Sequence, residues 1–309
     1  MVQMIARASR PPAVVIVNPQ AGRLPGERRE EVVEALAEVF RLEIATTRDR
    51  GGGIEPARAA SDAGVPLVIA FGGDGHVNEV ANGVAGSASS LGIIPGGTMN
   101  VFARALGIPT DPLEAVRHLA SATPGGSRLV HLGKMDDRYF TFSAGCGFDA
   151  EAAERVERDV PSKRRFGELF FYWSAFRVLA GSYRHRNPAM TVKGPFGEIP
   201  VAMAIACNAG PYAYLAGRPV TLAPEVALEG GLDVFAMKKM RLEALPMYTW
   251  NSVFSGNLVS HGDAFYESDL EEFDIVADKP YQRHVDGEPL EPATSTHFCI
   301  ARNILRVTG

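Results

Sequence analysis

Apolar and polar residues alternate with two different periodicities along the first third of the chain. Short runs rich in β-branched residues, such as AVVIV at 13–17, are typical of buried strands. Residues 26–40 instead place apolar side chains three and four positions apart, which predicts a helix. Alternating strands and helices favour an α/β, doubly wound parallel-sheet domain at the N-terminus. The expected strands are 13–17, 41–47, 66–71 and 91–95, and the expected helices are 26–40, 54–64, 76–84 and 99–107.

Beyond residue 127 the pattern changes to strand-like runs joined by short polar turns. This pattern predicts a second domain that is mostly antiparallel β and sandwich-like. One segment, 162–183, is too long and too continuous for a strand and predicts a helix. We expect a first domain at 1–127, with 298–309 packing back on it, and a second domain at 128–297.

Composition and charge narrow the class of protein. A length of 309 residues fits two domains, and a net charge of −5 argues against a general nucleic-acid binder. The three cysteines, Cys146, Cys207 and Cys299, are far apart and form no CxxC pair, which favours a reducing compartment. No run of ~20 apolar residues predicts a membrane span. We therefore expect a cytoplasmic protein, which can still meet the inner face of a membrane from the side.

Two glycine-rich loops follow consecutive predicted strands. The first is Gly72-Gly73-Asp74-Gly75, and the second is PGGTMN at 95–100. In a parallel sheet both loops fall at the carboxyl ends of strands, where such folds bind ligands. Glycine allows the backbone to approach a ligand closely, and helix N-termini favour anions. The alternatives are a phosphate-binding edge or tight turns with helix caps. Neither a P-loop nor a dinucleotide fingerprint is present.

Asp74 is an acidic residue inside a loop that is predicted to bind phosphate. A carboxylate beside a phosphate is repelled unless a cation lies between them. Asp74 is therefore a candidate ligand for Mg²⁺, which uses few carboxylates and keeps several waters. The alternative is a helix N-cap, for which Asp is a preferred residue, and both roles are compatible.

Four segments together carry a resemblance to a known family. They are VNPQAG at 17–22, GGDGHVNEVANG at 72–83, IPGGTMNVFAR at 94–104 and VDGEPL at 285–290. In this order and at this spacing the chain resembles the diacylglycerol kinase catalytic-domain family, which includes bacterial lipid kinases and the sphingosine and ceramide kinases. The resemblance implies an ATP-binding α/β domain, a β-rich lipid-substrate domain, and ATP with Mg²⁺ bound in the cleft between them.

The resemblance also implies roles for individual residues. Glu288 is the expected proton acceptor, while Asp286 and Asp74 support Mg²⁺ or position the acceptor, and these roles are exchangeable among the carboxylates. Asp74 and Glu288 are the expected metal ligands. Without the resemblance, Asp286-Gly287 predicts a hairpin turn. The expected nucleotide-binding residues are Asn18, Pro19, Gly22, Thr47, Gly72, Gly73, Asp74, Gly75, His76, Asn78, Glu79, Gly97, Thr98 and Asn100.

The chain departs from the family pattern at three positions. His76 stands where the family usually has a phosphate-contacting threonine, and Val101 stands where Asp is common. Gly230 replaces an Asp that supports a structural Mg²⁺, for which Glu229 or Asp233 is a candidate substitute.

The resemblance predicts an ATP-dependent lipid kinase, with diacylglycerol as the expected acceptor. The alternative acceptors are phosphatidylglycerol, a sphingoid base and a soluble metabolite, and a non-catalytic nucleotide or lipid binder of the same fold is the rival from another class. The expected partner is a lipid substrate at a membrane surface, and a homodimer is one option.

The basic and aromatic segment 161–186 is either a membrane-facing element or a helix that packs its aromatic side chains inward.

Overall fold

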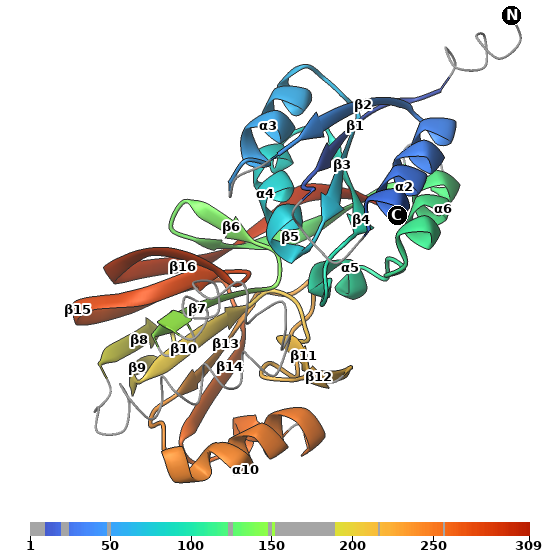
Figure 1. Cartoon of the computed structure of the whole chain (residues 1–309). Helices are drawn as coiled ribbons and strands as arrows, with labels where there is room; N and C mark the ends of the chain where they lie inside the picture. The colour runs from blue at the N-terminus through green and yellow to red at the C-terminus, as the bar shows by residue number, and fades with distance from the viewer. Residues whose placement is uncertain are drawn as a thin grey trace, which may run out of the picture. The chain divides into compact units, whose positions relative to one another are not determined.

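The computed structural model divides the chain into two compact units (Figure 1). Unit 1 comprises Met1–His131 and Arg302–Gly309, and unit 2 comprises Leu132–Ala301. The predicted helix at 162–183 lies outside the described residues. The structure describes residues 10–19, 25–47, 51–122, 126–147, 150–151, 189–215, 217–255 and 257–309.

The sheet of unit 1 is parallel throughout its first four strands, which lie in the order β4-β3-β1-β2. All six residues of β3 are buried, as expected for a strand with both faces covered. At the end of the chain, Arg306 and Val307 of β16 pair in parallel with β4. The predicted α/β class of the N-terminal domain is confirmed. The strands are β1 (Pro12–Val17), β2 (Arg41–Thr46), β3 (Leu67–Gly72), β4 (Ser90–Pro95) and β16 (Glu288–Thr308).

Helices of unit 1 cover both faces of this sheet. Figure 1 shows α3 and α4 on one side and α2 and α6 on the other. Gly64 and Gly107 have φ of 74° and 80° just after α3 and α5, so each of these helices ends in a glycine C′ stop, in agreement with the helix ends expected at 64 and 107. The helices are α2 (Gly26–Val39), α3 (Ile54–Asp62), α4 (Asp74–Val84), α5 (Val101–Ala105) and α6 (Pro112–Ser121).

Helix α6 was not anticipated from the pattern, although its start carries a local signal. The carboxylate of Asp111 accepts hydrogen bonds from the backbone N–H groups of Leu113 and Glu114, both at 3.0 Å. Pro112 occupies the first turn, where its missing N–H costs nothing. An Asp-Pro pair before an apolar run is therefore a usable helix start.

Unit 2 is built mainly from antiparallel strands, in the order β14-β13-β10-β7-β15-β16. This confirms the predicted strand-rich second domain. Strands β11 and β12 form a separate two-stranded sheet. The strands are β5 (Ser127–Met135), β6 (Arg138–Phe140), β7 (Ser143–Gly147), β8 (Met190–Gly194), β9 (Gly197–Val201), β10 (Met203–Cys207), β11 (Ala213–Leu215), β12 (Arg218–Val220), β13 (Leu232–Met237), β14 (Ala264–Leu270) and β15 (Glu272–Val285).

Both faces of the central strands of unit 2 are covered. Successive residues of a strand point to opposite faces, and along β13 Val234 joins one apolar cluster while Phe235 joins another. Tyr248 of α10 (Leu245–Trp250) packs in the second cluster, and a π-helical turn, η3 (Asn251–Ser255), continues that helix. Within the described part of the chain, no helix is long and apolar enough to cross a membrane.

Candidate functional site

The two glycine loops of unit 1 lie backbone against backbone. The N–H of Gly96 donates to the carbonyl of Gly72 at 2.8 Å. A Cβ on Gly97 would stand 2.7 Å from the Cα of Gly73 and 3.7 Å from the nitrogen of Asp74. Real Cβ atoms do not approach another atom as closely as 2.7 Å, so glycine at 97 is what allows the loops after β3 and β4 to meet.

Asn100 shapes the second loop from within. It has φ of 49°, a left-handed conformation that Asn tolerates better than most residues. Its Oδ1 accepts from the N–H of Gly97 at 2.9 Å, and its Nδ2 donates to the carbonyl of Gly97 at 3.0 Å. Thr98, at the tip of the same loop, is exposed.

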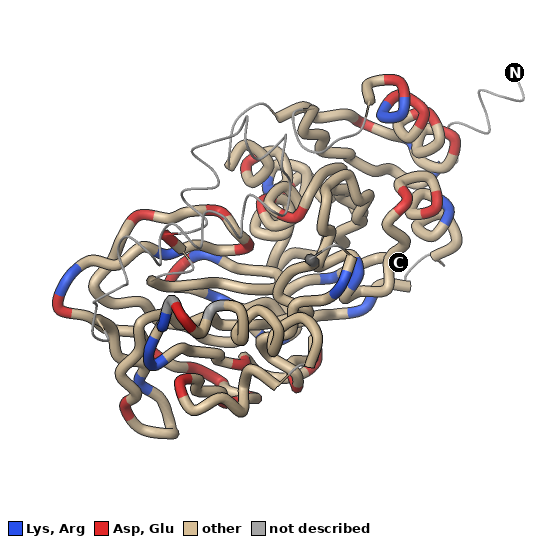
Figure 2. Tube along the Cα trace, turned by 60° about the horizontal axis from the view of Figure 1, so that its bottom comes forward, with Lys and Arg blue, Asp and Glu red and all other residues tan. Residues whose placement is uncertain are grey.

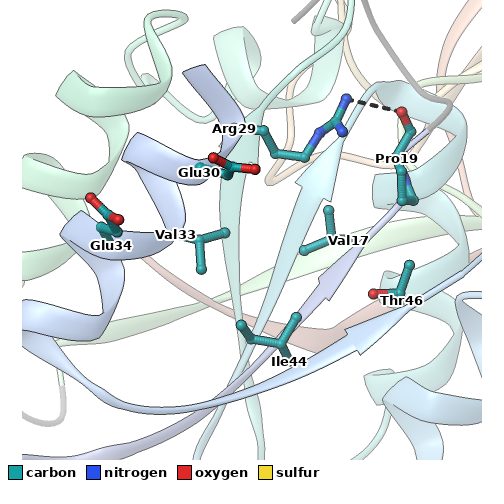
Figure 3. A pocket seen from close by; sticks show the side chains of 8 residues that line it. All are labelled: Val17, Pro19, Arg29, Glu30, Val33, Glu34, Ile44 and Thr46. Atoms are coloured by element: carbon teal, nitrogen blue, oxygen red, sulfur yellow. Dashed lines mark hydrogen bonds between the residues drawn. The ribbon is translucent and has the colours of Figure 1, made fainter. Parts of the chain in front are cut away.

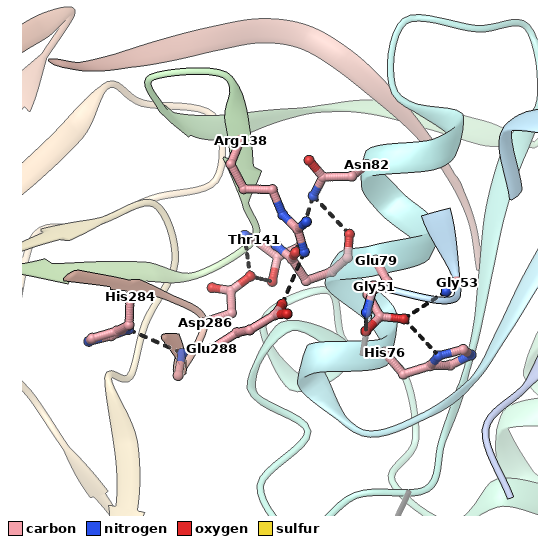
Figure 4. Close-up of polar contacts among 12 residues, drawn as sticks. Gly51, Gly53, His76, Glu79, Asn82, Arg138, Thr141, His284, Asp286 and Glu288 are labelled. Atoms are coloured by element: carbon pink, nitrogen blue, oxygen red, sulfur yellow. Dashed lines mark hydrogen bonds and ion pairs between the residues drawn. The ribbon is translucent and has the colours of Figure 1, made fainter. Parts of the chain in front are cut away.

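Glu79 lies buried beneath the first loop and holds the glycine turn before α3 (Figure 4). Its carboxylate accepts from the N–H groups of Gly51 at 2.7 Å and Gly53 at 2.9 Å. Desolvation raises its pKa, but the attraction of His76 and the two backbone hydrogen bonds outweigh that effect and bring the pKa below the ordinary value. Glu79 therefore stabilises this turn as an anion.

His76 also lies inside unit 1. Its Nε2 is 2.9 Å from the carbonyl oxygen of Ile16, and its Nδ1 is 3.7 Å from a carboxylate oxygen of Glu79, which is longer than a hydrogen bond. Its side chain packs over Gly72, where an added Cβ would meet it at 2.8 Å. The ring thus links α4 to β1, and its predicted nucleotide contact stays a prediction.

The remaining predicted nucleotide-binding residues differ in exposure. Thr47 is buried after β2, and its hydroxyl has no hydrogen-bond partner among the described residues. Asn78 is buried in α4, Asn18 and Asp74 are half-buried, and Pro19 is exposed. Gly22 lies outside the described residues.

A groove of about 390 Å³ opens beside β1, β2 and α2 (Figure 3). Arg29 crosses its rim and donates to the carbonyl of Pro19 at 2.9 Å. Its walls include Glu30 and Glu34, and α2 as a whole carries five Glu against two Arg, a predominance of acid visible in Figure 2. This acidic lining disfavours phosphate, so the groove is a poor phosphate site.

The acidic motif of unit 2 begins with a hairpin turn between β15 and β16. Asp286 and Gly287 have φ of 46° and 79°, as two-residue hairpin turns require. The Asp286 carboxylate is buried and accepts four hydrogen bonds, two from Thr141 and one each from the N–H groups of Phe142 and Ser143, at 2.7–3.0 Å (Figure 4). Burial raises the pKa of Asp286, and the four donors oppose that rise. Both carboxylate oxygens thus bind residues 141–143, which lead into β7.

Glu288 follows this turn and forms an ion pair with Arg138 of β6. The guanidinium nitrogen and the carboxylate oxygen are 3.0 Å apart, and the two side chains are 21% and 18% exposed respectively. The pair is therefore partly shielded yet reachable from solvent. Arg138 was not among the predicted site residues, because nothing in the run DDRYF at 136–140 distinguishes it from a surface cation.

Of the two candidate metal ligands near Gly230, Asp233 is engaged with protein donors. The Asp233 carboxylate accepts from the hydroxyl of Tyr266 and from the N–H of Asp269, and burial raises its pKa. Glu229 is exposed. Among the residues that the structure describes, no three His, Cys, Asp or Glu side chains gather as metal ligands.

Comparisons with known proteins show which family the chain resembles. A family model for the diacylglycerol kinase catalytic domain matches residues 12–134. A diacylglycerol kinase of Bacillus subtilis is 32% identical over 239 residues, which cover 74% of this chain and 75% of the relative. A probable YegS-like lipid kinase of Chromohalobacter salexigens is 40% identical over 157 residues, which cover 50% of this chain and 49% of the relative, so the match spans about half of that relative.

A solved structure shows the same fold. The crystal structure of a diacylglycerol kinase from Bacillus anthracis matches with a TM-score of 0.73 at 24% identity, covering 97% of each chain. The resemblance drawn from the four sequence motifs is confirmed by these matches.

We predict that the free energy of unfolding of the Glu79→Gln variant falls less on acidification than that of wild type. The folded-state pKa of Glu79 lies below its ordinary value of 4.5, so its stabilisation is present above that value and is lost as the pH falls through the folded pKa. Glu79→Gln should lower the free energy of unfolding by about 1–3 kcal/mol at neutral pH and show a smaller further loss at acid pH.

Urea unfolding at neutral and acid pH measures both effects. Glu34→Gln, a change at an exposed position of α2, is the matched control and should follow wild type at both pH values. Equal acid losses for wild type and Glu79→Gln would show that the Glu79 carboxylate does not stabilise the turn.

Proposed function

Because this chain belongs to the diacylglycerol kinase family, a family of lipid kinases, we propose that it transfers the γ-phosphoryl group of ATP to a hydroxyl of a membrane lipid. Diacylglycerol is the proposed acceptor. The observation that carries the proposal is the meeting of the loops at Gly73 and Gly97, which brings two glycine backbones together where β3 and β4 end. Parallel sheets bind ligands at this edge.

The nucleotide is proposed to bind at these loops of unit 1. Gly72–Gly75, Gly97 and the exposed Thr98 offer backbone and hydroxyl groups to the phosphates. The buried Thr47 hydroxyl, which lacks a partner among the described residues, is a further donor for the nucleotide. The role proposed for Glu79 and Asn100 is to fix the loop shapes through the hydrogen bonds described above.

Mg²⁺ is proposed to arrive with the nucleotide. Asp74, half-buried at the first position of α4 and next to the Gly97 loop, would hold it. One carboxylate together with phosphates and waters is a usual environment for this ion. When bound, the ion screens the negative charge on the phosphates.

Glu288 is proposed to accept the proton of the lipid hydroxyl. The hydroxyl oxygen forms the new bond to the γ-phosphorus, the bond from that phosphorus to the bridging oxygen breaks, ADP leaves, and the proton passes to the carboxylate. Arg138 holds that carboxylate in one orientation, and Asp286 holds the turn that carries it.

The first test is phosphoryl transfer by purified protein. Labelled ATP and Mg²⁺ are incubated with detergent-dispersed diacylglycerol, phosphatidylglycerol or sphingosine, and labelled lipid is measured. Glu288→Gln should lower kcat by about 10²–10⁴-fold while ATP binding is retained, because the proton then lacks an acceptor. Glu291→Gln, at an exposed position of the same strand, is the matched control and should retain wild-type kcat. Absence of transfer to every lipid would contradict the proposal, and so would a Glu288→Gln variant with wild-type kcat.

The second test concerns the orientation of Glu288. Arg138→Gln removes the ion-pair partner and should lower kcat about tenfold at unchanged KM for ATP, because a misoriented group reacts more slowly. Arg138→Lys, which keeps the charge, should recover part of the loss. Arg283→Gln breaks an ion pair with Asp136 in the same unit and serves as control. If the kcat of Arg138→Gln falls only as far as the folded fraction of the variant falls at the assay temperature, Arg138 has a purely structural role.

A further inference from the structure

Three of the large apolar side chains that are exposed on the protein lie on one short helical segment of unit 2. Met247, Trp250 and Phe254 are 39%, 59% and 51% exposed. They recur three and four positions apart along α10 and η3, which places them on one stripe. On the opposite side of the same segment, Tyr248 and Ser252 are buried.

The buried side fixes this segment to unit 2. The Tyr248 hydroxyl donates to Asp263 at 3.1 Å, and the carbonyl of Ser252 accepts from the N–H of Thr221 at 2.9 Å. The stripe is therefore presented by an anchored helix. The other exposed large apolar residues among those described, Ile44 and Leu129, both belong to unit 1.

The stripe combines stacked aromatic rings with cations. Trp250 and Phe254 stack with ring centroids 4.6 Å apart, and the guanidinium of Arg218 lies 5.1 Å from the centroid of Phe254. Lys239 and Arg241, both exposed, precede the helix, and Glu243 is an exposed acid between them and the stripe. Arg241 is already paired with Asp263 at 3.2 Å, so its charge is balanced within the protein. The chemistry is that of an interfacial surface, on which aromatic side chains enter the acyl boundary and cations meet anionic headgroups.

We propose that the stripe of Met247, Trp250 and Phe254, with Arg218 beside it, docks on an anionic lipid membrane. The choice of a membrane rests on the proposed function, since an enzyme acting on a bilayer lipid must reach it from the surface. Arg218, which lies against Phe254 and is exposed, supplies positive charge beside the apolar stripe and so complements such a surface. A singly exposed apolar residue such as Ile44 has no stacked partner of this kind and is ordinary on a protein surface.

Vesicle sedimentation tests the proposal without depending on catalysis. Wild-type protein is mixed with vesicles of phosphatidylcholine, alone or with phosphatidylserine, in the absence of ATP and diacylglycerol. The double variant Trp250→Ala/Phe254→Ala should partition about tenfold more weakly, since it loses the apolar contact. Arg218→Gln should weaken binding only to the vesicles that contain phosphatidylserine. Ile44→Ala is the matched control and should bind as wild type does.

Kinase activity and oligomeric state complete the test. The double variant should phosphorylate detergent-dispersed diacylglycerol at the wild-type rate but lose activity on diacylglycerol in vesicles. Wild-type vesicle binding by the double variant would overturn the proposal. If the same variant also converted a wild-type dimer to a monomer, the stripe would be a subunit interface instead. Failure of every protein to phosphorylate any lipid would refute the proposed function, while the sedimentation result would still decide the docking surface.

Discussion

The acidic turn of unit 2 depends on the hydrogen bonds that the buried carboxylate of Asp286 accepts. Its two oxygens accept four hydrogen bonds from three consecutive residues, 141–143, and so tie the β15–β16 turn to the connection from β6 into the start of β7. A buried carboxylate without such donors would be strongly unfavourable, so turn and segment are mutually required. Because Glu288 follows the turn and Arg138 begins β6, the same interaction sets where the two partners of the ion pair emerge.

Unit 1 uses polar motif residues in a similar way. Glu79 and Asn100 use their side chains to hold backbone N–H groups of glycine turns, and His76 bonds to the carbonyl of Ile16. These side chains define the shape of the loops from the inside. Of the loop residues, Thr98 is exposed, and Gly73, Asp74, Gly75 and Gly97 are half-buried. Backbone N–H groups of glycine loops before a helix are suited to a phosphate-bearing ligand.

The alternation of strands and helices up to Gly107 was predictable, because each apolar run has the period of the element that it forms. Gly64 and Gly107 marked helix ends, and Asp286-Gly287 marked a hairpin. Helix α6 was missed although Asp111-Pro112 is a start signal for it. Helix α10 was missed because its six residues, Leu245–Trp250, are too few to show a helical period. The pairing of Arg138 with Glu288 was out of reach, since 150 residues separate the two and neither type nor spacing encodes the contact.

The division of labour between Asp286 and Glu288 is the central claim, and Asp286→Asn tests it most directly. The free energy of unfolding of wild type and variant is measured in urea. The Mg²⁺ dependence of lipid phosphorylation is then measured under conditions in which both proteins are folded. If Asp286 holds the turn, the variant loses about 3 kcal/mol of stability, because the Asn side-chain N–H₂ group must face a donor, and its half-saturating Mg²⁺ concentration is unchanged. Wild-type stability combined with a raised Mg²⁺ requirement would contradict the account and make Asp286 a metal ligand.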